Sequence, residues 1–80
     1  ESNTLIVRNM DRPGCITEVS AALSREKINV ATMQVFRHKR GGLAVMVVET
    51  DQSIPENVVA ELKMKEDILE VISLNLEEGR

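Results

Sequence analysis

The chain has 80 residues and a mass of 8.9 kDa, a length that fits one domain spanning residues 1–80. Its formal net charge of −3 argues against a general nucleic-acid binder, and no apolar run approaches the roughly 20 residues of a membrane span. One cysteine and one histidine exclude a zinc or iron–sulfur site built within the chain, because such sites need about four ligands. We therefore expect a single small domain with no metal site.

The two ends of the chain bear on where the protein works. The N-terminus has no basic segment followed by an apolar one, so it does not resemble a signal peptide. A single cysteine suits a reducing compartment, and we expect a cytoplasmic protein. The sequence does not begin with Met, which indicates a domain cut from a longer chain.

The first half of the chain changes its hydrophobic period twice. Residues 4–10 read as a strand, which Asp11-Arg12-Pro13-Gly14 ends because Pro cannot donate to a ladder. Apolar side chains then recur at helical spacing, which predicts a helix over about 14–26. Residues 28–38 read as a long strand. Its alternation predicts one face with Ala31, Met33 and Val35, and the other with Val30, Thr32, Gln34 and Phe36.

The second half repeats the alternation of strand and helix. Lys39-Arg40-Gly41-Gly42 predicts a hairpin turn into an apolar strand over 43–50. Ser53-Ile54-Pro55-Glu56 has the spacing of a capping box and predicts a helix over about 55–64. A fourth strand over 67–75 follows, and the residues from Glu77 onward form a polar tail.

The order βαββαβ, with a core over about residues 4–75, predicts an α+β, ferredoxin-like fold. In that fold a four-stranded antiparallel sheet carries both helices on one face. The other face then stays bare, and Val30 and Phe36, with Ile6 or Met10, are expected to form an apolar patch there. A long edge strand over 28–38 can also pair with a second copy. We therefore expect at least a homodimer.

The junction between the first strand and the first helix is the best candidate for a binding site. Helix N-termini present unpaired N–H groups that bind carboxylates, and Asn9 and Asp11 add acceptors for an ammonium group. Asn29 lies near the start of the second strand, which spans residues 28–38. In a side-by-side dimer, Asn29 of one copy could face this junction of the other copy. Such a set suits a free amino acid. The alternative is purely structural, with Asp11 as a helix cap, Pro13-Gly14 as a turn and Asn29 as a turn residue.

The sequence gives little support for catalysis or for RNA binding. Cys15 needs a nearby base to act as a nucleophile, and the only histidine, His38, is predicted at the end of a distant strand. We expect no catalytic residue. The basic run Arg37-His38-Lys39-Arg40 could bind RNA, but sheets of this shape stack bases on aromatic residues, and only Phe36 is available. A solvated hairpin, or one contacting a neighbouring domain, is the alternative for this run.

Two segments resemble the hallmark motifs of the ACT domain, a small regulatory module that binds amino acids. They are Asp11-Arg12-Pro13-Gly14 after the first strand and Lys27-Ile28-Asn29-Val30 at the start of the second long strand. The resemblance covers about residues 4–75 and implies the βαββαβ fold. It implies a ligand site shared between two domains, formed by Asn9, Asp11, Gly14, Cys15 and Asn29, with backbone contacts from Ile16 and Val30.

This sequence departs from the family pattern at two positions. Lys27 stands where many relatives have Gly, so the turn before Asn29 is expected to differ. Cys15 replaces a usual aliphatic residue beside the ligand.

Within the family, the chain resembles most the ACT domain that ends the beta subunit of bacterial iron–sulfur-dependent L-serine dehydratases. This likeness is carried by residues 5–9, 29–33, 40–42, 44–51 and 54–56. It implies a parent lyase that converts L-serine to pyruvate and ammonia with a four-iron four-sulfur cluster held outside this chain. The chain alone is expected to be a regulatory and oligomerising domain that binds L-serine and contacts a catalytic domain or subunit.

Two alternatives to this parent remain. The serine-sensing ACT domain of D-3-phosphoglycerate dehydrogenase looks nearly as similar, including its Gly-Gly hairpin. A dimerisation module that binds no ligand is the other.

Overall fold

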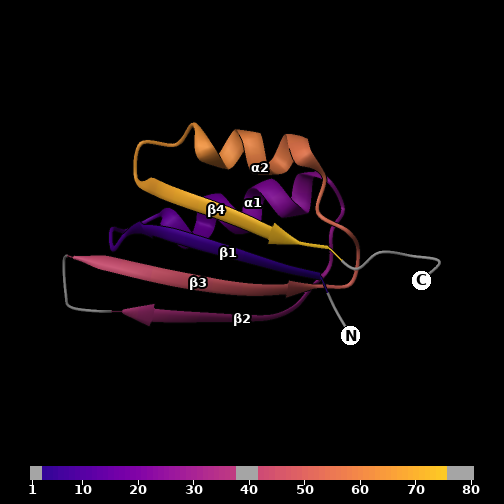
Figure 1. The fold of residues 1–80 in the computed structure, drawn as a ribbon, viewed down its shortest axis with the longest axis horizontal. Helices are drawn as coiled ribbons and strands as arrows, with labels where there is room; N and C mark the ends of the chain where they lie inside the picture. The colour runs from indigo at the N-terminus through magenta and orange to yellow at the C-terminus, as the bar shows by residue number, and fades with distance from the viewer. Residues whose placement is uncertain (1–2, 38–41, 76–80) are drawn as a thin grey trace.

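The computed structural model describes residues 3–37 and 42–75, and it confirms the predicted element order and fold class (Figure 1). The sheet is antiparallel and four-stranded, in the order β2-β3-β1-β4. Both edge strands, β2 and β4, are therefore open to pairing. The elements are β1 (Asn3–Met10), α1 (Cys15–Arg25), β2 (Val30–Arg37), β3 (Leu43–Thr50), α2 (Glu56–Lys63) and β4 (Ile68–Leu74).

The core lies between one face of the sheet and the two helices, which cover that face together (Figure 1). Alternate residues of the two central strands point into it, because successive side chains of a strand face opposite sides. The helices contribute residues at helical spacing. The fully buried members include Leu5 and Val7 of β1, Met46 and Val48 of β3, Val19 and Leu23 of α1, and Val58 and Leu62 of α2.

The predicted division of β2 into two faces is wrong at its start. Val30 pairs with Thr50 and Thr32 pairs with Glu49, so Ala31 is an extra residue in the ladder. Such a bulge shifts the alternation by one position. Val30 therefore joins Met33 on the core side, although the sequence placed it on the bare face with Phe36.

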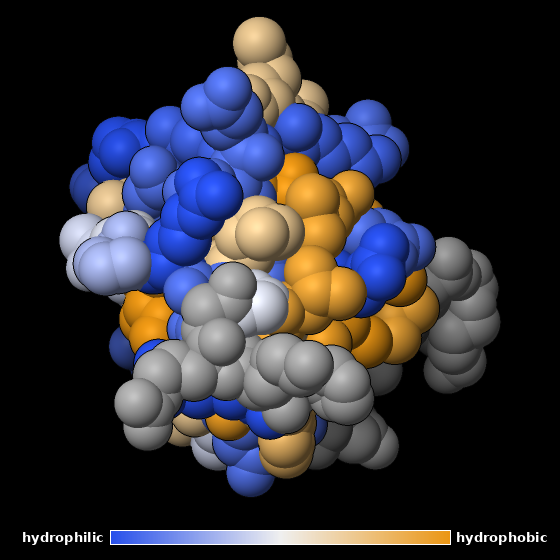
Figure 2. Space-filling model, turned by 90° about the vertical axis from the view of Figure 1, so that its left-hand side faces the viewer, coloured by the Kyte–Doolittle hydropathy of each residue, from blue (hydrophilic) through white to orange (hydrophobic). Residues whose placement is uncertain are grey.

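The bare face nonetheless carries an apolar patch, here called the open-face patch. It is formed by Ile6, Phe36, Val45, Val47 and Ile72, which the strand register places on neighbouring strands. Figure 2 shows hydrophobic side chains gathered on the right of the end view, with blue residues among them. One interruption is the ion pair between Arg8 Nε and Glu70 Oε1, 3.1 Å apart and half exposed.

Each end of α1 uses a left-handed backbone conformation. Gly14 is the N-cap, with φ 93° and ψ −16°, and no side chain caps the helix. At the other end Lys27 has φ 59°. The N–H of Ile28 bonds to Leu23 O and that of Lys27 to Ser24 O, which is the Schellman pattern. Lys27 thus takes a backbone conformation that glycine favours.

The predicted capping box at the start of α2 is wrong. The N-cap is Pro55, no side chain caps the helix, and Ser53 lies outside it. Asn75 fixes this segment instead, because its Oδ1 accepts from Ile54 N at 2.9 Å and its Nδ2 donates to Ile54 O at 3.2 Å. The segment before α2 is thereby tied to the end of β4, and Ile54 is buried in the core.

Candidate ligand site

A cleft of about 420 Å³ opens where β1 meets α1, at the end of the sheet to which β2 also runs. Its volume is in the range of small-molecule sites. Five of the seven predicted ligand residues line it: Asn9, Asp11, Gly14, Cys15 and Ile16. The remaining lining residues are Arg12, Pro13, Val35, Arg37 and Ala44.

Asn9 supplies a buried polar atom with no partner inside the described part of the chain. Its side chain points to the core side of β1, and the residue is only 3% exposed. The amide Nδ2 donates to Met10 O at 2.8 Å, but Oδ1 accepts no hydrogen bond from any described residue. A buried acceptor left unpaired costs stability, so its persistence favours a bound donor such as an ammonium group.

Asp11 is the negative charge of the cleft. Its backbone N–H donates to Gly42 O at 2.7 Å, which fixes the residue against the start of β3. Its side chain is 13% exposed, and Oδ2 lies 2.9 Å from Arg37 Nε. The N–H does not point at that oxygen, so the contact is an ion pair without a hydrogen bond. The alternative role of Asp11 as a helix cap is wrong, since α1 has no side-chain cap.

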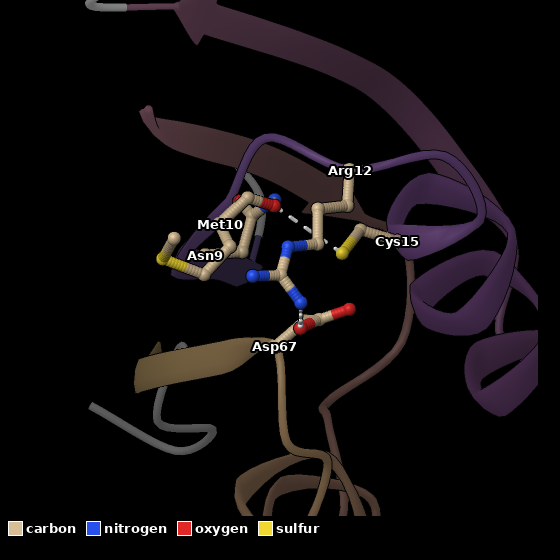
Figure 3. Close-up of polar contacts among 5 residues, drawn as sticks. All are labelled: Asn9, Met10, Arg12, Cys15 and Asp67. Atoms are coloured by element: carbon tan, nitrogen blue, oxygen red, sulfur yellow. Dashed lines mark hydrogen bonds and ion pairs between the residues drawn. The ribbon is translucent and has the colours of Figure 1, made fainter. Parts of the chain in front are cut away.

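The loop between β1 and α1 is held by backbone and side-chain contacts (Figure 3). Cys15 Sγ donates to Met10 O at 3.4 Å, the oxygen that also accepts from Asn9. Arg12 Nη1 donates to Asp67 Oδ1 at 3.0 Å, which turns this guanidinium toward the start of β4. In the first turn of α1, which borders the cleft, Cys15 N–H donates to Arg12 O at 3.4 Å and Glu18 N–H to Gly14 O at 2.9 Å. The N–H groups of Ile16 and Thr17 have no acceptor within the helix.

The structure separates the other two predicted ligand residues from this cleft within one chain. Val30 pairs with Thr50, which also pairs with Asn3, so Asn29 and Val30 lie level with the opposite end of β1. The length of that strand makes the separation roughly 20 Å. Asn29 is exposed there, and its Nδ2 donates to Asp51 Oδ2 at 2.6 Å.

Arg37 is the cleft residue that sequence reasoning missed. In the sequence it stands out only as the first member of a basic run, and the other members, His38, Lys39 and Arg40, lie outside the described residues. The predicted topology could have indicated this position of Arg37, because β1 and β2 run in the same direction and finish at the same end of the sheet. Residues that follow or end both strands are neighbours there.

The described residues hold neither a metal-binding cluster nor a membrane-spanning helix. Over residues 3–37 and 42–75, no three side chains of His, Cys, Asp or Glu gather closely enough to hold a metal ion. With one cysteine in the whole sequence, an iron–sulfur cluster does not fit this chain. Neither helix in the described ranges is both long and apolar enough to cross a bilayer.

Fold and cleft together define a class, the ferredoxin-like α+β domain with a ligand-sized cleft where its first strand meets its first helix. The model of one family, the ACT domain, matches residues 3–63. The chain belongs to the ACT domain family.

Curated relatives carry this domain within longer chains. A D-3-phosphoglycerate dehydrogenase from Methanocaldococcus jannaschii is 39% identical over 89% of this chain, and 14% of the relative is covered. The probable L-serine dehydratase beta chain from Bacillus subtilis is 37% identical over 88% of this chain, and 31% of it is covered. The chain thus spans less than a third of either relative.

Solved structures share the fold at low identity. A formyltetrahydrofolate deformylase from Pseudomonas putida KT2440 superposes with a TM-score of 0.79 at 15% identity, over 95% of this chain and 29% of that one. The ACT domain from GTP pyrophosphokinase of Chlorobium tepidum gives 0.69 at 12% identity, over 90% and 95% of the two chains. These likenesses support the fold alone.

Proposed function

We propose that this ACT domain binds a free amino acid, with L-serine as the first candidate, in the cleft between β1 and α1. The observation that carries the proposal is the buried, unpartnered Oδ1 of Asn9, in a cleft that Asp11 also lines. Both groups accept hydrogen bonds and suit an ammonium group. The N–H groups of the first turn of α1 suit a carboxylate.

We further propose that two copies complete the site. Asn29 and Val30 lie at the opposite end of the sheet from Asp11, so in one chain they cannot contact the same small ligand. A second copy that packs along the open edge strand β2 and the first helix can bring its Asn29 to the cleft. The site would then require a homodimer or a larger assembly.

We also propose that the chain is a regulatory part of a larger enzyme, because the relatives that it matches carry this domain within longer chains. We propose an L-serine dehydratase as the parent, a lyase that forms pyruvate and ammonia and holds its iron–sulfur cluster in another part. A D-3-phosphoglycerate dehydrogenase is the second candidate, because relatives of that name match at 39% and 36% identity. Assays of the full-length protein for pyruvate from L-serine, and for NAD reduction with 3-phosphoglycerate, separate the two.

Calorimetry of the 80-residue chain tests ligand binding. L-serine and a panel of other amino acids are titrated into the wild type and into the variants Asp11→Ala and Asn29→Ala. We expect saturable heat for the wild type and weaker binding for both variants. Glu66→Ala, in the exposed turn after α2 and away from the cleft, is the matched control and should bind as the wild type does.

Sedimentation measures the assembly in the same samples. No heat with any amino acid at millimolar concentration would contradict the proposed ligand class. A strictly monomeric chain that still binds would contradict the shared site. A dimer that binds none of the amino acids would support the module without a ligand.

A further inference from the structure

Arg37 is the second charged group of the cleft, and its position follows from the strand register. Arg37 pairs with Ala44, and Ala44 also pairs with Asn9, so the three lie in one row across β2, β3 and β1. Neighbouring strands are about 4.8 Å apart, which puts the outer two backbones about 10 Å apart. The middle residue is a buried alanine, so the arginine side chain can extend over it toward Asp11.

The guanidinium of Arg37 keeps most of its donors available. Its Nε lies 2.9 Å from Asp11 Oδ2 without an aligned hydrogen bond, and its side chain is 64% exposed. An arginine carries five N–H donors in a planar fork that fits a carboxylate. Arg12, the other arginine of the cleft, is engaged by a hydrogen bond to Asp67.

We propose that Arg37 binds the carboxylate of the amino-acid ligand and so restricts the site to ligands with a free carboxylate. This inference rests on the proposed amino-acid site. A zwitterion has one group for each half of the cleft, since its ammonium fits Asn9 Oδ1 and Asp11, and its carboxylate fits Arg37 together with the N–H groups of the first turn of α1. On binding, Asp11 exchanges its ion pair with Arg37 for one with the ligand, and the guanidinium turns to the ligand carboxylate.

The test compares L-serine with L-serinamide, which keeps the ammonium and hydroxyl groups but has a neutral amide in place of the carboxylate. Calorimetry is run at a pH where both amines are protonated, on the wild type and Arg37→Gln. We expect the wild type to prefer L-serine. In the variant the Kd for L-serine should rise by about ten-fold or more, the loss typical of a charge-assisted hydrogen bond, with L-serinamide changed much less.

Three further variants serve as controls or as a replacement for Arg37→Gln. Arg25→Gln removes an exposed arginine that pairs with Glu61 away from the cleft, and it should bind both compounds as the wild type does. Arg12→Gln should keep the preference for L-serine. Circular dichroism checks that each variant is folded. If Arg37→Gln unfolds, Arg37→Lys replaces it, and its preference for L-serine should fall because lysine lacks the planar fork.

The outcomes distinguish failure of the role proposed for Arg37 from failure of the proposed amino-acid-binding function on which it rests. If the wild type binds no amino acid, the proposed function is wrong and the role of Arg37 is wrong with it. If the wild type binds L-serine but Arg37→Gln keeps the same preference over L-serinamide, only the role of Arg37 is overturned. Loss of the preference in Arg12→Gln alone would assign the carboxylate to Arg12.

Discussion

Gly14 and Lys27 both take a left-handed backbone conformation at the ends of α1, and we expect substitutions at these two positions to change stability in opposite directions. At Gly14, with φ 93°, a Cβ would meet no heavy atom within 4 Å, so Gly14→Ala creates no clash. Its cost is backbone strain alone, about 1–2 kcal/mol for an L-residue in this region. The less flexible unfolded chain offsets about 0.4–1 kcal/mol of that cost. We therefore expect the free energy of unfolding to fall by about 1 kcal/mol.

Lys27→Gly is the mirror-image change. Lys27 is exposed and has φ 59° at the position after the helix, where the Schellman pattern favours glycine. Glycine there relieves the strain and costs some unfolded-state entropy, so we expect a gain of about 0.5–1 kcal/mol. Urea denaturation followed by circular dichroism measures both variants. Gly14→Ala as stable as the wild type, or Lys27→Gly less stable, would refute the strain argument.

Four more substitutions test other parts of the structure by the same denaturation measurement. Arg37→Gln should destabilise by about 0.5–1 kcal/mol because it leaves the mostly buried Asp11 carboxylate without its exposed counter-ion. Asp11→Asn should cost less, and equal losses would contradict this asymmetry. Asn75→Ala should cost about 2 kcal/mol, since Ile54 loses partners for both backbone groups, and an unchanged midpoint would contradict that role. Leu62→Ala should cost about 2–5 kcal/mol as a fully buried core truncation, and a loss below that range would place the residue outside the core.

Local sequence patterns were enough to predict the order of elements and the fold class, but two details depended on distant partners. The bulge at Ala31 depends on how β2 pairs with β3, and alternation within one strand carries no information about that pairing. The spacing from Ser53 to Glu56 fits a capping box, yet burial of Ile54 and its hydrogen bonds to Asn75 place the helix start later.

The sequence predicts the part of the candidate site that lies in the loop between β1 and α1, but not the part contributed by β2. Asn9 and Asp11 flank the end of β1, so a motif in sequence places them together. Arg37 reaches the same cleft only because two parallel strands, separated by β3, end at one edge. The topology likewise implies that Asn29 lies at the opposite end of the sheet from Asp11. The proposed site therefore requires a second copy of the chain.

Amide-resolved NMR spectra of the chain during an L-serine titration test the central claim most directly. We expect shifts at Asn9, Asp11 and the first turn of α1, together with shifts at Asn29 and Val30. Absence of shifts at millimolar ligand would contradict the account. Shifts confined to the second cleft, between α2 and β4 and lined by Glu56, Lys63 and Ser73 among others, would contradict it equally.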